Sequence, residues 1–290
     1  MKLESTFTYN QVLEEPENAL KYYKAYGFLV VENVFSLIQC QEMKKRAELL
    51  VEEDKSLKTI GFSLKKNNHH SDNNFLSSAY KINYFYEDEM IDKNGNFMDK
   101  KINCISKLGH CLHDLDKVFN QFSYNKKFKN LLNIINLKNP ILSQSSYIFK
   151  QPFIGGEYLW HQDSTYLLTK PLSCTAIWTA IDDSNENNGC LYVIPGSHNE
   201  NIRKRVKYVN NEIIRETLIK KDWDESKKHP LCTKKGSIIL FHGSLAHKSS
   251  KNTSNMSRNA YVLHFFNKNA EYSKDNWLQR PNNLPFISYR

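Results

Sequence analysis

The chain has 290 residues, of which 40% are hydrophobic and 12% aromatic, enough for one large domain with a sizeable core. It has no apolar run near the roughly 18 residues of a membrane span, no secretory leader and no Ser-Lys-Leu peroxisomal end, so we expect a cytoplasmic protein. The net charge is +9, but the seven arginines are scattered and the lysines lie in Asn-rich segments without interleaved aromatic residues, which disfavours a nucleic-acid partner.

The first part of the chain is predicted to be rich in helices. Pro16 precedes a helix over 17–26 that Gly27 ends, and an apolar strand follows over 28–31. Ser36 opens a capping box and a second helix that runs to about residue 54. The further elements predicted here are a loop over 58–74, a strand over 80–86, a turn over 92–96 and helices over 105–120 and 126–135.

From Tyr147 onward the apolar pattern becomes that of strands. The clearest runs are 174–181, 190–194, 236–241 and 260–266. Helices first and strands later indicate one domain, in which a helix-rich support (about 1–140) packs on a β core (about 141–290). The charged segment 199–228 either lies over the mouth of this core and selects substrate or is a solvated excursion.

The six cysteines, at positions 40, 104, 111, 174, 190 and 232, are expected to be reduced thiols. They form no Cys-x-x-Cys pair, and such wide scatter without a secretory leader disfavours both disulfides and a zinc site. We therefore give them no part in the chemistry.

Two histidines and one carboxylate form a candidate metal site. His161 and Asp163 stand two residues apart at a predicted strand edge, where side chains at i and i+2 share a face. His247 supplies a third ligand, and such a triad leaves open positions on a six-coordinate Fe(II), as oxygen chemistry requires. The same His-x-Asp spacing recurs at His70 and Asp72, in a polar run without periodicity that we interpret as an exposed loop without function.

Arg258 is a candidate carboxylate receptor beside this metal site. Residues 252–255 have turn composition and lie between predicted strands 237–245 and 259–266. A turn centred there makes His247 and Arg258 cross-strand neighbours roughly 5 Å apart. The guanidinium pairs with a carboxylate through two hydrogen bonds, so it is suited to hold the far end of a dicarboxylic keto acid whose near end chelates the iron.

Three other histidines of the second half are given structural interpretations. His242 and His264 lie in predicted strands, and we interpret each as a packed or hydrogen-bonded core residue. His198 ends a tight turn, where a structural role and a substrate contact both stay open.

These motifs lie in a sequence that resembles the phytanoyl-CoA dioxygenase family. The matching segments, in the order of the family, are 146–152, 155–157, 161–163, 188–198, 247–249, 257–258, 276–279 and 284–286. The resemblance covers nearly the whole chain. It implies a mainly β fold, a double-stranded β-helix (jelly roll) core with helices packed on one side. It also implies Fe(II), 2-oxoglutarate and O2 as cofactors, with ascorbate as an optional reductant.

The resemblance also implies a role for each motif residue. His161, Asp163 and His247 would bind the iron, and Arg258 with Ser249 would bind the distal carboxylate of 2-oxoglutarate.

Farther from the triad, the match to the family is partial. Trp178 matches a family tryptophan that lines the co-substrate pocket, and Ser146 stands where the family has a methionine. The family also uses an upstream lysine, and a gap-free match places Asn103 there. Lys101 and Lys107 are the nearby candidates to replace it.

We therefore expect a 2-oxoglutarate-dependent non-haem iron dioxygenase that hydroxylates a small molecule, with an acyl-CoA or lipid-like compound as the suggested substrate. Asp163 favours hydroxylation over halogenation, because a halogenase must free the carboxylate's position for chloride. A protein that binds metal or 2-oxoglutarate without turnover, as a sensor or scaffold, is the alternative. A basic RNA-binding protein is a third and weaker one.

Overall fold

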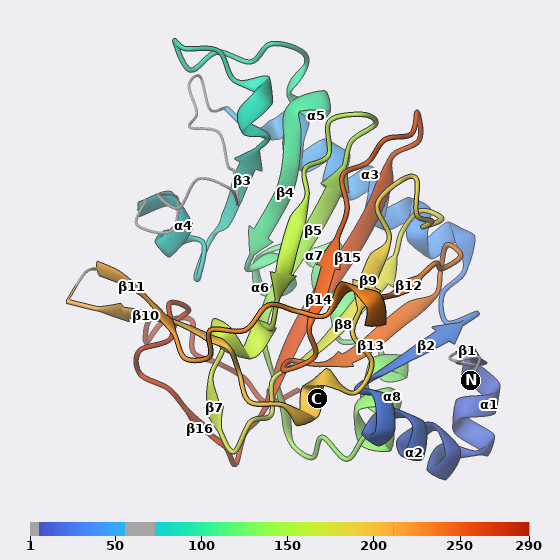
Figure 1. Cartoon of the computed structure of the whole chain (residues 1–290). Helices are drawn as coiled ribbons and strands as arrows, with labels where there is room; N and C mark the ends of the chain where they lie inside the picture. The colour runs from blue at the N-terminus through green and yellow to red at the C-terminus, as the bar shows by residue number, and fades with distance from the viewer. Residues whose placement is uncertain (1–5, 56–72, 211, 290) are drawn as a thin grey trace.

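The computed structural model describes residues 6–55, 73–210 and 212–289 (Figure 1). Its core is built from two sheets that pack against each other, one of eight strands and one of four. In spatial order, the large sheet contains β1 (Thr6–Thr8), β2 (Phe28–Glu32), β13 (Ile238–His242), β8 (Thr175–Ala180), β15 (Arg258–Asn267), β5 (Pro140–Lys150), β4 (Ile105–His110) and β3 (Ile82–Tyr86). The small sheet contains β12 (His229–Leu231), β9 (Leu191–Val193), β14 (His247–Ser249) and β6 (Tyr158–His161). The β1–β2 pair is parallel and the other pairs of these two sheets are antiparallel, so the large sheet is mixed.

The central strands are buried on both faces, and their side chains alternate between two cores. In β8, Ile177 faces the cluster that packs under the helices, whereas Trp178 faces the cluster between the two sheets. In β15, Leu263 faces the cluster under the helices and Val262 faces the cluster between the two sheets. A strand with two buried faces needs apolar residues throughout, which explains why this region of the sequence is a series of nearly continuous apolar runs.

The helices cover the face of the large sheet that is turned away from the small sheet, and Figure 1 shows α3 and α7 behind the sheet. They are α1 (Tyr9–Glu14), α2 (Pro16–Tyr26), α3 (Leu37–Glu53), α5 (Lys101–Cys104), α6 (Leu112–Leu115), α7 (Lys117–Ser123) and α8 (Lys126–Ile134). The short helix α4 (Asn73–Ser77) lies apart from them, with Phe75 packed against Phe85 and Trp277 in a separate cluster. The predicted ends of α2 and α3 are confirmed: Gly27 adopts the left-handed conformation after α2, and Ser36 caps α3 with a reciprocal bond to Gln39. Within the described residues, no helix combines the length and the apolar character needed to cross a bilayer.

The helix predicted over 105–120 is wrong in its first half. Residues 105–110 form β4 between β3 and β5, and only then do α6 and α7 follow. All six residues of β4 are buried, so the strand lacks the alternation that distinguishes a half-exposed strand from a helix. Most of the predicted loop over 58–74, including His70 and Asp72, lies outside the described residues. The last two residues of that predicted loop belong to α4 instead.

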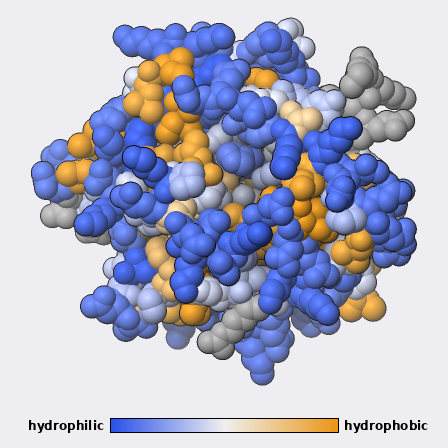
Figure 2. Space-filling model, turned by 90° about the horizontal axis from the view of Figure 1, so that it is seen from below, coloured by the Kyte–Doolittle hydropathy of each residue, from blue (hydrophilic) through white to orange (hydrophobic). Residues whose placement is uncertain are grey.

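The charged segment 199–228 contains structure of its own. It forms the hairpin of β10 (Lys204–Val209) and β11 (Glu212–Thr217), followed by the short helix η5 (Glu225–Lys227). Figure 1 shows the hairpin projecting at the left edge of the molecule, beside the pair β7 (Thr169–Lys170) and β16 (Glu271–Tyr272). Seen from below, the surface is mostly hydrophilic, and its apolar side chains gather in small groups (Figure 2).

The mainly β architecture with flanking helices confirms the predicted fold class. The residues before 140 supply more than a support, however, because β1, β2, β3 and β4 are half of the large sheet.

Candidate metal centre and co-substrate pocket

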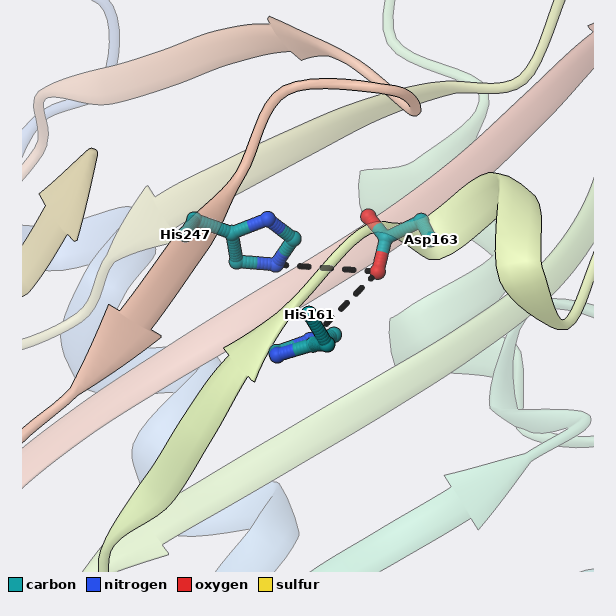
Figure 3. Close-up of side chains that lie close together, drawn as sticks. All are labelled: His161, Asp163 and His247. Atoms are coloured by element: carbon teal, nitrogen blue, oxygen red, sulfur yellow. Dashed lines mark ion pairs between the residues drawn. The ribbon is translucent and has the colours of Figure 1, made fainter. Parts of the chain in front are cut away.

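The predicted metal ligands come together at the end of the small sheet. His161 ends β6, Asp163 begins the short helix η3 (Asp163–Thr165), and His247 begins β14 as the register partner of His161. The Nε2 atoms of His161 and His247 lie 3.7 and 3.6 Å from Oδ1 of Asp163. Figure 3 shows the three side chains pointing toward one another. In the part of the chain that the structure describes, this is the one cluster with the geometry to hold a metal ion.

The hydrogen bonds of the two histidines direct unprotonated nitrogens toward the centre of this cluster. Nδ1 of His161 lies 2.7 Å from the carbonyl oxygen of Leu159, and Nδ1 of His247 lies 3.0 Å from that of Leu245. A carbonyl oxygen only accepts, so each ring donates from Nδ1, and in its neutral form it presents the lone pair of Nε2. The distances from the two Nε2 atoms to Oδ1 of Asp163 are too long for hydrogen bonds. Two nitrogen lone pairs and a carboxylate oxygen in this arrangement fit a divalent cation between them.

The charges of the cluster also suit a metal ion. Burial by itself raises the pKa of the Asp163 carboxyl, but the adjacent His247, His264 and His161 outweigh burial and lower it below its usual range. Burial, helped by the nearby His161, lowers the pKa of His247 to about 4. Near neutral pH the site therefore contains an ionised carboxylate and a neutral imidazole, the protonation states in which these groups bind metals.

The predicted carboxylate receptor is buried next to this cluster. The Arg258 side chain is 1% exposed, and its Nη2 donates to the carbonyl oxygen of Gly189 at 2.9 Å and to Oγ of Ser249 at 3.1 Å. Nε and Nη1 have no hydrogen-bond partner within the described residues. Burial lowers the pKa of Arg258 to about 10, so the guanidinium stays charged at neutral pH. A buried cation with two unpaired donor nitrogens fits a carboxylate.

The predicted hairpin that made His247 and Arg258 cross-strand partners is wrong. β14 pairs with β6 and β9 in the small sheet, whereas β15 pairs with β5 and β8 in the large sheet. Residues 250–257 connect the two sheets instead of turning back within one. The two side chains still reach the same cavity because Ser249, two residues after His247, touches the Arg258 guanidinium.

Lys150 was missed by the sequence reasoning. It is the register partner of Arg258 in β5 and is 1% exposed, and its Nζ donates to Oγ of Ser249 at 2.8 Å and to the carbonyl oxygen of Gly156 at 2.7 Å. Burial and the nearby Arg258 lower the pKa of Lys150 well below its usual value. The signal was available, because Lys150 follows Ser146 and Ile148 at a spacing of two in one strand.

A cavity of about 810 Å³ contains both the metal cluster and the Arg258 guanidinium. Trp178 and Ser146 line it as expected, and the Trp178 ring centre lies 5.3 Å from the Arg258 guanidinium carbon. Of the lysine candidates, the structure brings Lys107 to the cavity. Burial lowers the pKa of Lys107 to about 7, and its Nζ lies 3.3 Å from Nε2 of His110.

The structure does not bring the other two upstream candidates to the cavity. Nζ of Lys101 donates to the carbonyl oxygen of Asp54 at 2.7 Å, and the side chain of Asn103 donates to Asp99 at 2.9 Å. Neither residue lines the cavity.

Of the histidines interpreted as structural, His264 is the one that lines the cavity. It is buried and hydrogen-bonded, but its Nε2 lies 3.1 Å from Oδ2 of Asp163. His198 contacts the carbonyl oxygen of Lys24, and His242 accepts from the backbone N–H of Ser244.

Comparison with known proteins identifies the family. The family model of phytanoyl-CoA dioxygenase (PhyH) matches residues 23–260. The chain belongs to the phytanoyl-CoA dioxygenase family. It is 39% identical over 263 residues to "Phytanoyl-CoA dioxygenase" of Arabidopsis thaliana, covering 90% of this chain and 92% of that protein. It is 38% identical over 272 residues to "Phytanoyl-CoA dioxygenase domain-containing protein 1 homolog" of Caenorhabditis elegans, covering 90% and 94%.

Solved structures of low sequence identity share the fold of this phytanoyl-CoA dioxygenase family member. One is EctD from S. alaskensis with 2-oxoglutarate and 5-hydroxyectoine, with a TM-score of 0.62, 16% identity and coverage of 94% of this chain and 86% of that chain. Another is the epimerase SnoN in complex with Fe3+, alpha ketoglutarate and nogalamycin RO, with a TM-score of 0.63, 11% identity and coverage of 94% and 99%. By family the chain is a non-haem iron dioxygenase, and its His-Asp-His cluster fits that class.

Proposed function

We propose that this protein couples the oxidative decarboxylation of 2-oxoglutarate, to succinate and CO2, with hydroxylation of a small molecule. The observation that supports this most is the content of one cavity: a convergent His-Asp-His cluster and a buried guanidinium with two unpaired donor nitrogens. When bound at the cluster, Fe(II) supplies the chemistry with O2. His161, Asp163 and His247 would hold it.

The residues around the cluster would bind and orient the co-substrate. Nε and Nη1 of Arg258 are free to donate to the distal carboxylate, and Ser249 sits against the same guanidinium. Trp178 forms a wall beside the guanidinium, and Lys107 with Ser146 lines the cavity from the neighbouring strands β4 and β5. The surrounding apolar walls, such as Phe241 and Val262, keep water away from the reacting groups.

The finer proposal for the substrate is an anionic compound of the acyl-CoA or lipid-like kind. The hairpin β10–β11 and the residues after it line the cavity with Lys204, Arg215 and Lys221. Arg215 forms no ion pair with any described residue, so its charge is available to an anionic substrate. All six cysteines are free thiols, which agrees with the expected cytoplasmic location.

The test of the proposed function is succinate release. Purified protein with Fe(II), 2-oxoglutarate and ascorbate under air should form succinate slowly without a substrate, measured by mass spectrometry. Replacing Fe(II) by redox-inert Zn(II) should abolish it, and so should Asp163→Ala. His161→Ala should sharply weaken Mn(II) binding, because the site loses one of three donors. Metal-loaded protein that binds 2-oxoglutarate but forms no succinate, with or without cell extract, would support the binding-only alternative.

A further inference from the structure

The two carboxylate oxygens of Asp163 have different partners. Oδ1 faces Nε2 of His161 and Nε2 of His247, the side on which a metal ion would bind. Oδ2 lies 3.1 Å from Nε2 of His264, which is on β15 and is not one of the three candidate ligands. The carboxylate is therefore held between the metal cluster and a third histidine, His264.

The surroundings of His264 determine which nitrogen carries its proton. Its Nδ1 lies 3.0 Å from Nε2 of Gln144, its register partner in β5. An amide nitrogen only donates, so Nδ1 of His264 accepts and the ring proton is on Nε2, where it is donated to Oδ2 of Asp163.

The backbone at His264 is also fixed. Oγ of Ser143 donates to the carbonyl oxygen of His264 at 2.9 Å, and the register of β15 with β5 shifts between His264 and Phe265. Such irregularities re-aim side chains and are frequent beside active sites. The ring is thus held from its backbone, from Nδ1 and from Nε2.

We propose that His264 is a positioning residue that occupies Oδ2 of Asp163, so that the carboxylate binds the metal ion through Oδ1 alone. This inference rests on the proposed function. Three protein donors leave about three positions on a six-coordinate ion. 2-Oxoglutarate, which chelates with two atoms, and O2 need all of them. If Oδ2 were free to turn toward the metal, a bidentate carboxylate would take the position that O2 requires.

The test is the number of exchangeable water molecules on bound Mn(II), measured by electron paramagnetic resonance in ¹⁷O-labelled water. Wild-type protein should show about three waters, because three donors come from the protein. His264→Leu removes the Nε2–H donor, and its count should fall to about two. His264→Gln keeps an N–H donor within reach of Oδ2 and should restore about three. Succinate release in His264→Leu should fall roughly 10-fold or more, the usual cost of losing a partner behind a metal ligand.

Two further variants separate positioning from general damage. His242→Leu removes another largely buried strand histidine, one that bonds to the backbone of Ser244 and not to a candidate metal ligand. This variant should keep the number of water molecules on Mn(II) that wild-type protein shows. His264→Phe keeps a ring of similar shape without a donor, and it replaces His264→Leu if that variant does not fold. Its count should also be about two.

The outcomes are distinguishable from failure of the proposed function. Wild-type protein that binds no Mn(II) would overturn both. An unchanged count in His264→Leu and His264→Phe would overturn the positioning role alone. A rise to about four would mean that Asp163 had left the metal, which also contradicts the proposal.

Discussion

The chemistry of Arg258 follows from its burial. A guanidinium that is 1% exposed, with two donor nitrogens unpaired, is costly to the protein unless an anion completes its hydrogen bonds. Lys150 lies across from it in the adjacent strand, and both side chains donate to the same oxygen of Ser249. A carboxylate that enters the cavity therefore meets one buried guanidinium, whose Ser249 partner is held from behind by Lys150.

We predict that Arg258→Lys weakens 2-oxoglutarate binding although it preserves the charge. The planar, two-bond contact becomes a single contact, at a cost of about 1–3 kcal/mol, or roughly 5- to 150-fold in affinity. Mn(II) binding should be unchanged, which calorimetric titration of each ligand in turn will show. Equal 2-oxoglutarate affinity in the variant would transfer the anchoring role to another side chain, with Lys107, which lines the cavity, the next candidate.

The sequence predicted the candidate ligands of the site but not the residue that contacts one of them from behind, and the reason is physical. His161, Asp163, His247 and Arg258 could be proposed from the sequence because a later histidine and arginine accompany the His-x-Asp pair, a combination typical of an iron and keto-acid site. The proposed role of His264 could not be predicted, because it depends on a contact between β15 and η3, whose residues His264 and Asp163 are 101 positions apart. Sequence alone identifies ligands better than the residues that hold the ligands in place.

At the scale of elements, the turn before β9 supports Arg258, the proposed co-substrate anchor. Gly189 has a φ of +82°, and its carbonyl oxygen accepts from both Arg258 and Ser249. A Cβ at this position would meet the carbonyl oxygen of Ser250 at 2.5 Å and Cε of Lys150 at 2.6 Å. The turn is therefore restricted to glycine by backbone conformation and by space.

We predict that Gly189→Ala lowers the free energy of unfolding by about 1–3 kcal/mol and weakens 2-oxoglutarate binding. Gly196→Ala is the matched control, because its φ is +80° but the nearest atom to a new Cβ lies 3.7 Å away. It should lose less stability and keep its affinity for 2-oxoglutarate. Urea unfolding and calorimetric titration of both variants check this, and equal losses in the two would contradict the role given to the Gly189 carbonyl.

Local signals predicted some elements and failed for others. The caps of α2 and α3 are encoded by neighbouring residues, so their ends could be predicted closely. The strand β4 could not be told from a helix, because burial on both faces removes the alternation. The register near Arg258 depends on which sheet each strand joins, and turn composition does not contain that information.

At the scale of the whole molecule, the sheet joins the two parts of the chain. β13 pairs with β2, and β5 pairs with β4, so strands from the first 110 residues lie on both sides of the central strands. The resemblance to a jelly-roll family predicted the fold class correctly. The pairing of β1 to β4 with later strands could not be predicted, because it joins segments far apart in the sequence and the local apolar periodicity does not encode it.

We predict that a fragment of residues 141–290 does not fold alone. Without β1 to β4 the fragment would expose the edges of β13 and β5, together with the apolar face that the helices cover. Near-ultraviolet circular dichroism and size-exclusion chromatography should show no fixed tertiary structure, or aggregation, with full-length protein as the control. A compact, cooperatively unfolding fragment would support the predicted division at about residue 140.

The three-residue strand β14 has a thermodynamic consequence. His247 and Ser249 are two residues apart on it, so one side chain serves the metal cluster and the other the co-substrate anchor. A ligand that restrains either side chain restrains the same short stretch of backbone, and the second ligand then has less freedom left to remove. Linkage is reciprocal, so the factor by which the metal tightens 2-oxoglutarate binding equals the factor by which 2-oxoglutarate tightens metal binding.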